Sequence, residues 1–253
     1  MEYKKQPVIK TQYQFLTGNV LKWIAAVSMT VDHIAAVVLK GYVRTNLALL
    51  SDGQVIRWKM LYHSMRSAGR TAFPLFAFLL VEGFLHTKDR KKYGWRLFLL
   101  AMLSEIPYDL AISGKLWNPA RQNVLVTLFL GFLVLCLVEF IKYQEKLSEW
   151  SVITACAGVI AVGGFLAWLC HSDYTYKGIL LICVLYFLHR YPVSAAAGGF
   201  CIWAERPMSF PAFLLLPFYN GKRGRKNMRL FYLFYPLHLS ILYGINIVFD
   251  WRI

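Results

Sequence analysis

Residues 21–40 read LKWIAAVSMTVDHIAAVVLK. The run is mostly apolar from Trp23 to Leu39, close to the roughly 20 residues that a transmembrane helix needs. Near its middle, Asp32 and His33 stand side by side. Ionisable side chains inside a membrane span are costly and usually face a functional site. The stretch therefore predicts a membrane helix that carries a candidate site.

The composition extends this interpretation to the whole chain. Of 253 residues, 58% are hydrophobic and 16% are charged, whereas a soluble domain carries about 25% charged residues. Apolar segments recur at roughly 20–39, 72–86, 94–112, 123–141, 151–170, 177–190, 193–205, 208–219 and 230–249. We therefore predict an all-α fold: a polytopic integral membrane helix bundle of about nine spans (8–10), forming one transmembrane domain over residues 1–253.

Basic residues between the apolar segments set a predicted orientation. The net charge is +15, and HTKDRKKYGWR (86–96) and NGKRGRKNMR (220–229) carry five basic residues each. Cytoplasmic loops collect Lys and Arg, so both stretches and the N-terminus are predicted to be cytoplasmic. The expected location is the cell (inner, cytoplasmic) membrane, with the lipid bilayer as a partner. No aromatic-rich basic platform indicates nucleic-acid binding.

Two regions depart from this simple pattern. Residues 40–70 should face outside, yet they are basic, and apolar residues recur in them at helical spacing. This favours an interfacial helix near 54–66, or a cationic lid over a substrate site. Pro and Gly residues near 193–219 favour re-entrant or broken helices, because irregular backbone at membrane depth is tolerated where protein buries it.

Helix geometry predicts that Lys22 and His33 lie on one side of the first span. Eleven steps of 100° leave a difference of about 20°, and the rise is about 16 Å. Lys22 then lies at the cytoplasmic surface and His33 past the middle of the membrane, so that both can line one tunnel. The structural alternatives are a snorkelling lysine and a core histidine bonded to a carbonyl. Asp32 points about 100° away and can pair with a cation from another helix.

Other ionisable residues lie inside predicted spans. Glu105 and Asp109 are four apart, hence on one face of the third span, and Glu105 has about the depth of His33. Glu82 and His238 lie nearer the cytoplasmic side. Buried carboxylates need compensation, and a purely structural ion-pair network is the alternative to a site. The candidate cations are Lys22, Arg70 and Arg96.

Several familiar catalytic motifs are absent from the sequence. It has no Gly-x-Ser-x-Gly elbow, no phosphate-binding glycine loop and no His-Glu-x-x-His helix. The five cysteines form no Cys-x-x-Cys pair and the histidines are scattered, so no metal site is predicted. A Ser-His-Asp triad stays open, since its members need not be close in sequence.

Several stretches resemble the TraX family. LKWIAAVSMTVDHIAAVV resembles its opening helix, and GRTAFPLFAFLLVEGFLHTKDRKKYGWRLFLLAMLSEIPYDL (69–110) is the most specific match. NVLVTLFLG and YPLHLSILY resemble later blocks, whereas residues 142–228 match poorly. The family's namesake is implicated in acetylating the N-terminal amine of a conjugative pilin. The family also looks like a branch of the multi-span membrane acyltransferases.

In that wider group a basic residue, ten intervening residues and a histidine mark the first helix, and Lys22 and His33 fit this spacing. The resemblance implies that His33 is the catalytic base and that acetyl-CoA is the donor. We therefore predict an acetyltransferase that acts on an amine, either the N-terminus of a peptide or pilin-like protein or a small amine. The alternatives are acyl transfer to a glycan hydroxyl, and a non-enzymatic transporter or assembly protein for surface fibres.

Each candidate residue receives an expected role. The catalytic residues are expected to be His33, Asp32, Glu105 and Asp109, the acids orienting the imidazole or holding the acceptor. The residues expected to bind the donor are Lys22, Arg70, Glu82, His238, Lys222, Arg223 and Arg225. Asn123 and Asn246 are candidates for stabilising an oxyanion.

Overall fold

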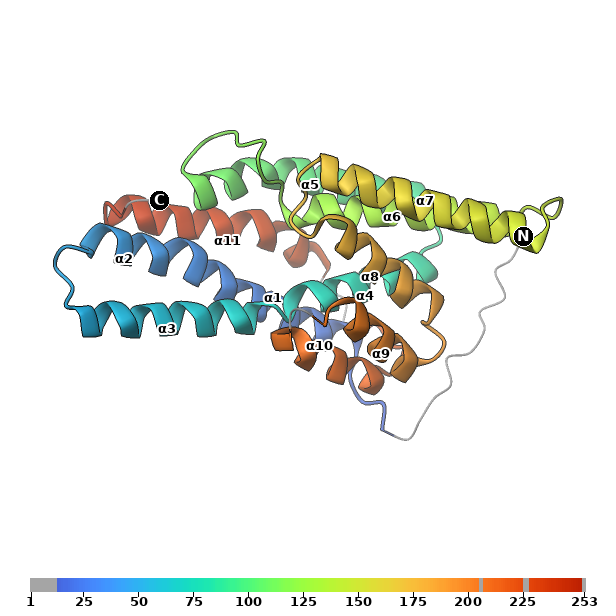
Figure 1. Cartoon of the computed structure of the whole chain (residues 1–253), viewed down its shortest axis with the longest axis horizontal. Helices are drawn as coiled ribbons and strands as arrows, with labels where there is room; N and C mark the ends of the chain where they lie inside the picture. Colours follow the sequence, from blue (N-terminus) through green and yellow to red (C-terminus); the bar gives the residue numbers. More distant parts are fainter. Residues whose placement is uncertain (1–12, 205–206, 225–227, 252–253) are drawn as a thin grey trace.

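The computed structural model describes residues 13–204, 207–224 and 228–251, and it is all-α in these ranges (Figure 1). Its elements are α1 Gly18–His33, η1 Ile34–Leu39, α2 Lys40–Asn46, α3 Asp52–Gly69, α4 Ala72–His86, α5 Arg90–Ser113, α6 Val124–Lys142, α7 Glu149–Leu169, α8 Thr175–Phe187, α9 Pro192–Ile202, η2 Pro207–Ser209, α10 Phe210–Leu215, η3 Leu216–Phe218 and α11 Met228–Val248. The nine predicted apolar segments all coincide with helices, so the all-α bundle is confirmed.

Several helices have the length and composition of membrane spans. Within the described residues, five helical runs are long and apolar enough to cross a bilayer: Gly18–Asn46, Asp52–His86, Val124–Lys142, Glu149–Leu169 and Phe231–Val248. Three shorter apolar helices lie at Thr175–Phe187, Pro192–Ile202 and Pro207–Phe218. The chain is a membrane protein. Its orientation, with a cytoplasmic N-terminus, stays a prediction.

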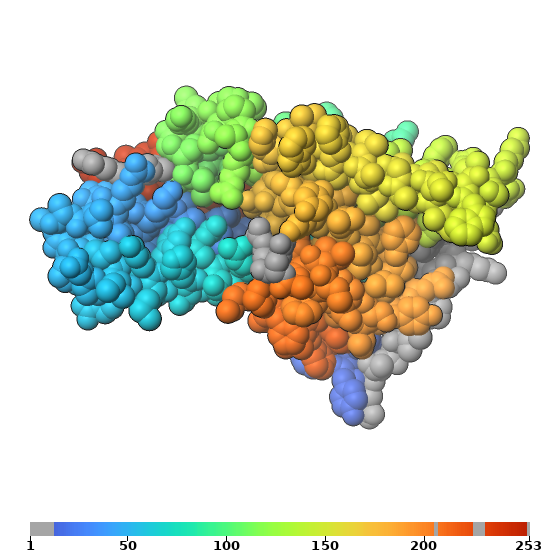
Figure 2. All heavy atoms as spheres, in the orientation of Figure 1, coloured from blue at the N-terminus to red at the C-terminus, as the bar shows by residue number. Residues whose placement is uncertain are grey.

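The first run is longer than a bilayer is thick. Its 29 residues rise about 43 Å, whereas the hydrocarbon core measures about 30 Å. It comprises α1, the π-helix η1 and α2, and it begins at Thr17, whose hydroxyl accepts a hydrogen bond from the Val20 N–H (3.4 Å). Together with α3 and part of α11 it forms an arm at one end of the molecule (Figures 1 and 2).

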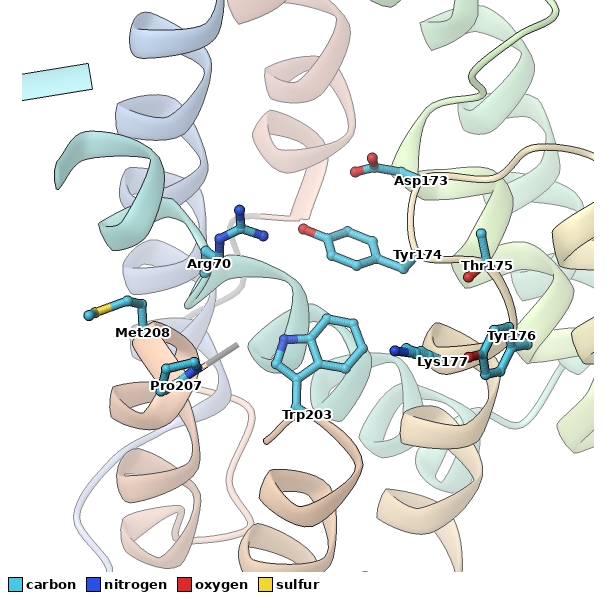
Figure 3. A pocket seen from close by; sticks show the side chains of 9 residues that line it. All are labelled: Arg70, Asp173, Tyr174, Thr175, Tyr176, Lys177, Trp203, Pro207 and Met208. Carbon is cyan, nitrogen blue, oxygen red and sulfur yellow. The ribbon is translucent and has the colours of Figure 1, made fainter. Parts of the chain in front are cut away.

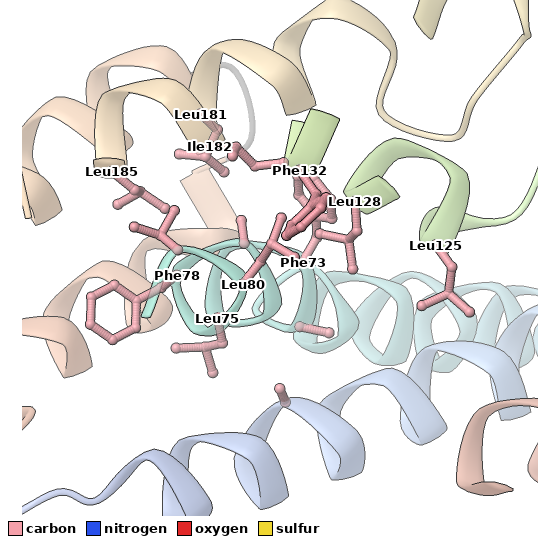
Figure 4. Packing of buried hydrophobic residues seen from close by; sticks show 14 of the residues in the cluster. Phe73, Leu75, Phe78, Leu80, Leu125, Leu128, Phe132, Leu181, Ile182 and Leu185 are labelled. Atoms are coloured by element: carbon pink, nitrogen blue, oxygen red, sulfur yellow. The ribbon is translucent and has the colours of Figure 1, made fainter. Parts of the chain in front are cut away.

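Helix α4 is the centre of the core. It is apolar around most of its circumference, which is the pattern of a helix buried on all sides. It packs on α1, α6, α8 and α10. The largest apolar cluster joins α4 to α6 and α8 (Figure 4). Its members in that view include Phe73, Leu75, Phe78, Leu80, Leu125, Leu128, Phe132, Leu181, Ile182 and Leu185.

The two irregular regions of the sequence form helices with clear boundaries. Near 193–219 the chain breaks into α9, η2, α10 and η3, and each of these elements has a proline in its first or second position: Pro192, Pro207, Pro211 and Pro217. Proline is tolerated there because the first N–H groups of a helix have no intrahelical partner. The predicted broken helices are therefore confirmed.

The helix expected near 54–66 is α3, and it is an integral part of the arm. Ser51 and Gln54 form a capping box at its start. The helix runs antiparallel to α1 and packs along α1, η1 and α2, instead of lying apart from the bundle. Its last residue, Gly69, permits the close approach, because a Cβ there would overlap the Asp32 side chain, Cβ included.

We predict that Gly69→Ala destabilises the protein by about 1–3 kcal/mol, because α3 must move away from Asp32. Gly53→Ala on the same helix is the matched control. A Cβ at Gly53 meets open space, so the expected change is a gain of up to about 1 kcal/mol. Melting temperatures of the detergent-solubilised variants provide the measurement. Equal effects of both substitutions would contradict the packing of α3 on α1.

Candidate active site

Two buried histidines join the first helix to the last. His33 Nδ1 lies 2.7 Å from His238 Nε2, although the residues are 205 positions apart. Their rings are nearly parallel, with centroids 5.0 Å apart. Phe234 also stacks on His238, with centroids 4.9 Å apart, and Tyr235 meets both imidazoles edge-on. Both histidines are buried, and these contacts hold the pair in one orientation.

The hydrogen bonds determine which nitrogen carries each proton. A carbonyl oxygen only accepts, so the 2.8 Å bond to the Phe234 carbonyl assigns a proton to His238 Nδ1. In the neutral ring, His238 Nε2 then accepts, and His33 Nδ1 must donate to it. His33 Nε2 is consequently left with a lone pair. Burial favours this neutral form, because an unpaired charge is costly in an apolar interior.

An elongated cavity of about 500 Å³ approaches this pair. Its α1 wall consists of Gly18, Lys22, Ala26 and Met29, and α4, α5, α6 and α11 supply the other walls. Met29 and Phe234 each precede one of the two histidines by four residues, which is one helical turn. The predicted shared face of Lys22 and His33 is thus present in the structure. Lys22 lies near the Gly18 end of the α1 wall, and His33 lies one helical turn beyond Met29, at the opposite end.

The end of the cavity farther from the histidines is rich in cations. Lys22, Lys92, Arg96 and Arg223 line it. Asp89 also lines it and caps α5, and the hydrogen bond from the Lys92 backbone N–H (2.9 Å) lowers the pKa of the Asp89 carboxyl. Even with that carboxylate ionised, positive charge exceeds negative charge at this end.

A loop from the C-terminal part of the chain brings basic residues to the start of α1. The carbonyl of Lys222 accepts from the Gly18 N–H (2.9 Å), and that of Arg223 accepts from the Asn19 N–H (3.0 Å). These bonds satisfy N–H groups that a helix start leaves unpaired. The Arg223 side chain lines the cavity, whereas Lys222 is exposed beside it. Arg225 lies outside the described residues.

Glu82 and Arg70 lie at different ends of α4. Glu82 lines the cavity, with its carboxylate 3.6 Å from His86 Nδ1 and beside the Tyr219 hydroxyl. Arg70 is at the start of α4 and borders a second cavity, not this one. The expected grouping of Arg70 with the donor-binding residues is therefore not what the geometry shows.

Asp32 does not contact His33. It forms an ion pair with Arg66 of α3, in agreement with the predicted pairing to another helix. The partner that orients His33 is His238, which we had expected among the donor-binding residues and nearer the cytoplasmic surface. His238 is ten residues into α11, about 15 Å, so it reaches the same depth as His33.

The acids of α5 are compensated by neutral donors. Glu105 accepts from the Asn123 side-chain amide, and Asp109 accepts from the Asn118 backbone N–H (2.7 Å). The expectation that Lys22, Arg70 or Arg96 would neutralise them was therefore wrong, because the turn before α6 folds back onto α5 and supplies amides instead. The side-chain amide of Asn246 is also engaged, donating to the Val37 carbonyl (3.2 Å).

Comparison with known proteins assigns the chain to a family. The model of the TraX protein family matches residues 17–246, a span that includes both histidines and every wall of the cavity. The chain belongs to the TraX family. A curated relative is the probable fimbrial assembly protein FimC, serogroup H1, of Dichelobacter nodosus. It is 31% identical over 254 residues, covering 88% of this chain and 92% of the relative. No solved structure matches the chain.

Some residues of this TraX site had no distinct signal in the sequence. Phe234, Tyr235 and Arg66 look like ordinary members of apolar or amphipathic helices, and only the fold brings them to His238, His33 and Asp32. The stretch YPLHLSILY, which includes His238, did resemble a later block of the TraX family.

We predict that Asn123→Ala lowers the stability of the TraX chain by about 1–3 kcal/mol, because buried Glu105 loses the side-chain amide that donates to it and keeps only the backbone N–H of residue 123 (3.3 Å). Asn123 also caps α6 by accepting from the Leu125 N–H (2.9 Å). Asn123→Ser keeps a capping oxygen and loses the reach to Glu105, so its melting temperature should fall between those of the wild type and the alanine variant. Identical melting temperatures for all three would contradict this role.

Proposed function

We propose that this TraX chain is a membrane-embedded acetyltransferase. It moves an acetyl group from acetyl-CoA to an amine, with His33 as the general base. The observation that carries the proposal is the His33–His238 pair, which lies one helical turn beyond Met29 and Phe234 in the wall of a cavity that Lys22, Lys92, Arg96 and Arg223 also line. The family's resemblance to multi-span acyltransferases, through Lys22 and His33, agrees with it.

The cavity suits the two chemically different halves of acetyl-CoA. Its cationic end complements the phosphates of the nucleotide, and clustered charge of one sign attracts a ligand of the other. The walls toward the histidines are apolar, including Ala26, Met29, Leu125 and Leu128, and suit the extended arm that ends in the thioester. A volume of about 500 Å³ falls within the 300–1,000 Å³ of ordinary ligand sites.

The transfer step uses the lone pair assigned to His33 Nε2. The acceptor nitrogen attacks the thioester carbonyl carbon, His33 takes a proton from that nitrogen, and a C–N bond forms. The C–S bond then breaks, and the sulfur leaves as CoA thiol after receiving the proton from His33. An N-terminal amine has a pKa near 7.7–8.0, so part of it is already neutral and nucleophilic near neutral pH.

His238 acts in this proposal as a positioning residue. Its Nε2 accepts a hydrogen bond from His33 Nδ1. This bond fixes the imidazole so that His33 Nε2 points away from His238 and can act as the base. When His33 takes a proton, the hydrogen bonds through His238 to the Phe234 carbonyl stabilise the charge. Asp32, Glu105 and Asp109 bind other partners, so in this proposal they stabilise the helices around the site and do not orient the imidazole.

The name of the D. nodosus relative favours a second candidate, a non-enzymatic role in assembling surface fibres. Fibre subunits with a free amino terminus would also be suitable acceptors, so the relative's name is compatible with either function. Binding of acetyl-CoA distinguishes the two functions, because an assembly factor without transferase activity does not need this donor. Because acetyl-CoA is cytoplasmic, the proposal implies that the cavity opens to the cytoplasm.

We predict that His33→Gln lowers acetyl transfer about 10²–10⁴-fold while leaving the melting temperature almost unchanged. The glutamine amide can donate to His238 but cannot act as a base. His238→Ala should also slow transfer, because His33 then loses its orienting partner.

His63→Ala, on the exposed side of α3, is the control. The assay is mass spectrometry of a peptide library incubated with purified protein and acetyl-CoA. Wild-type rates in His33→Gln would remove His33 from the mechanism.

We also predict that Lys22→Ala weakens CoA binding about tenfold, equivalent to about 1.4 kcal/mol. The loss should shrink at high salt, because screening reduces the electrostatic attraction. Lys59→Ala removes the same charge from the exposed side of the arm and should leave the affinity unchanged. Calorimetric titration at low and high salt measures both. Equal affinities in the two variants would argue against a donor site at this end.

A further inference from the structure

A second cavity, of about 620 Å³, is built from four separate parts of the chain (Figure 3). Arg70 lies between α3 and α4, residues 173–177 form the start of α8, Trp203 follows α9, and Pro207 and Met208 belong to η2. Within the described part of the chain, this cavity shares no lining residue with the one proposed for the donor. The two cavities are therefore distinct sites.

Hydrogen-bond donors dominate the lining of the second cavity. Arg70 and Lys177 are positively charged and can only donate, the indole N–H of Trp203 can only donate, and the Tyr174 hydroxyl can donate as well. Figure 3 shows the Arg70 guanidinium and the Tyr174 hydroxyl pointing toward one another. A wall of this kind suits a ligand that presents acceptor oxygens, and its two cations favour a ligand with negative charge.

The start of α8 adds to this preference for an anion. Residues 175–177 are the first three of the helix and all border the cavity, so the positive end of the helix dipole lies beside it. Tyr174 occupies the N-cap position without a capping hydrogen bond from its side chain in the described structure. The carboxylate in the lining, Asp173, forms an ion pair with Arg121 (3.5 Å), which offsets its negative charge.

The aromatic wall of this cavity is held in place by its own contacts. The Tyr174 ring stacks on Phe73 of α4, with centroids 3.8 Å apart, and Trp203 lies 5.3 Å from Tyr174. Thr175 has a φ of 47°, which is unfavourable for a β-branched residue and persists only where the surroundings fix the backbone. A wall that is ordered before a ligand arrives loses little conformational entropy on binding.

Helix α7 indicates the level of the cavity in the membrane. Trp150 and Trp168 are exposed near the two ends of this span, and their 18 residues of separation rise about 27 Å, close to the thickness of the hydrocarbon core of about 30 Å. Tryptophan is enriched at both membrane interfaces. Because the turn that leads into α8 directly follows α7, the cavity lies at the level of the lipid head groups.

We propose that the second cavity binds the phosphate of an anionic phospholipid from the leaflet at this level. Arg70 and Lys177 donate to the phosphate oxygens beside the start of α8, and basic pockets between membrane helices are a known way to bind lipid head groups. Tyr176 and Met208 are exposed at the edge of the cavity and contact the apolar part of the lipid. The lipid thereby links parts of the chain that are distant in sequence, independently of the proposed transferase activity.

The site is tested by lipid titration of the purified, delipidated protein in detergent. The probes are phosphatidylglycerol, which is anionic, phosphatidylcholine, which has the phosphate but no net charge, and inorganic phosphate. Native mass spectrometry counts the bound lipids, and melting temperatures report their effect on stability. Phosphatidylglycerol should bind and raise the melting temperature, phosphatidylcholine should bind more weakly, and inorganic phosphate at the same concentration should not stabilise the protein.

Two variants examine the lining residues. Arg70→Gln and Lys177→Gln should each weaken the tightest phosphatidylglycerol binding about tenfold, because each removes a charged donor, and Arg70→Lys should restore part of the loss. Arg57→Gln removes an exposed cation from α3 and should leave the affinity unchanged. If Arg70→Gln does not fold, Lys177→Gln provides the comparison.

Three outcomes would overturn the proposal. Wild-type affinity for phosphatidylglycerol in the glutamine variants would remove these cations from the site. Equal binding of phosphatidylcholine would contradict the preference for an anionic lipid. Stabilisation by inorganic phosphate equal to that by phosphatidylglycerol would show that the ligand is a soluble phosphate and not a lipid.

Discussion

The hydrogen bond between His33 and His238 is the constraint on which the site depends. A polar group buried in a membrane bundle needs a partner, and each imidazole here is the partner of the other. Because the two residues belong to the first and last helices, the bond exists only when the whole chain is folded. The Phe234 carbonyl completes the chain of bonds and makes the two ends of His33 different, one a donor and one a lone pair.

Positive charge in the cavity that Lys22 and Arg223 line has two physical consequences that the sequence alone does not separate. Clusters of Lys and Arg orient a membrane protein, and the same side chains create an attractive potential for anions. Both effects arise in the loop at 220–224. Its backbone carbonyls accept hydrogen bonds from N–H groups at the start of α1, and these bonds hold Arg223 beside Lys22 in the cavity wall. The loop from which the orientation is predicted thus also contributes a cation to the cavity wall.

Hydropathy and helical geometry were sufficient to predict the helices and the common face of Lys22 and His33. They were not sufficient to predict neighbours. A period of 3.6 residues indicates the direction in which a side chain points, but not which helix it meets, so the contact of His238 with His33 required the fold. The amides that bind Glu105 and Asp109 come from the turn between α5 and α6, where no periodic pattern operates. The position of Arg70 depended likewise on the antiparallel packing of α3 against α1.

The π-helix η1 begins directly after His33, and its hydrogen bonds span five residues, as from Lys40 N–H to the Ala35 carbonyl. Such a turn changes the direction, about the helix axis, in which all later side chains of the helix point. The face that carries Lys22 and His33 is consequently not continued by the corresponding face of α2, where Gly41 meets Asn246. Loss of one residue within 34–39 would change that rotation and turn the arm about the helix axis, while α1, which carries Lys22 and His33, kept its orientation. One wide turn at η1 thus allows a single continuous helix to present two differently oriented faces, one in α1 and one in α2.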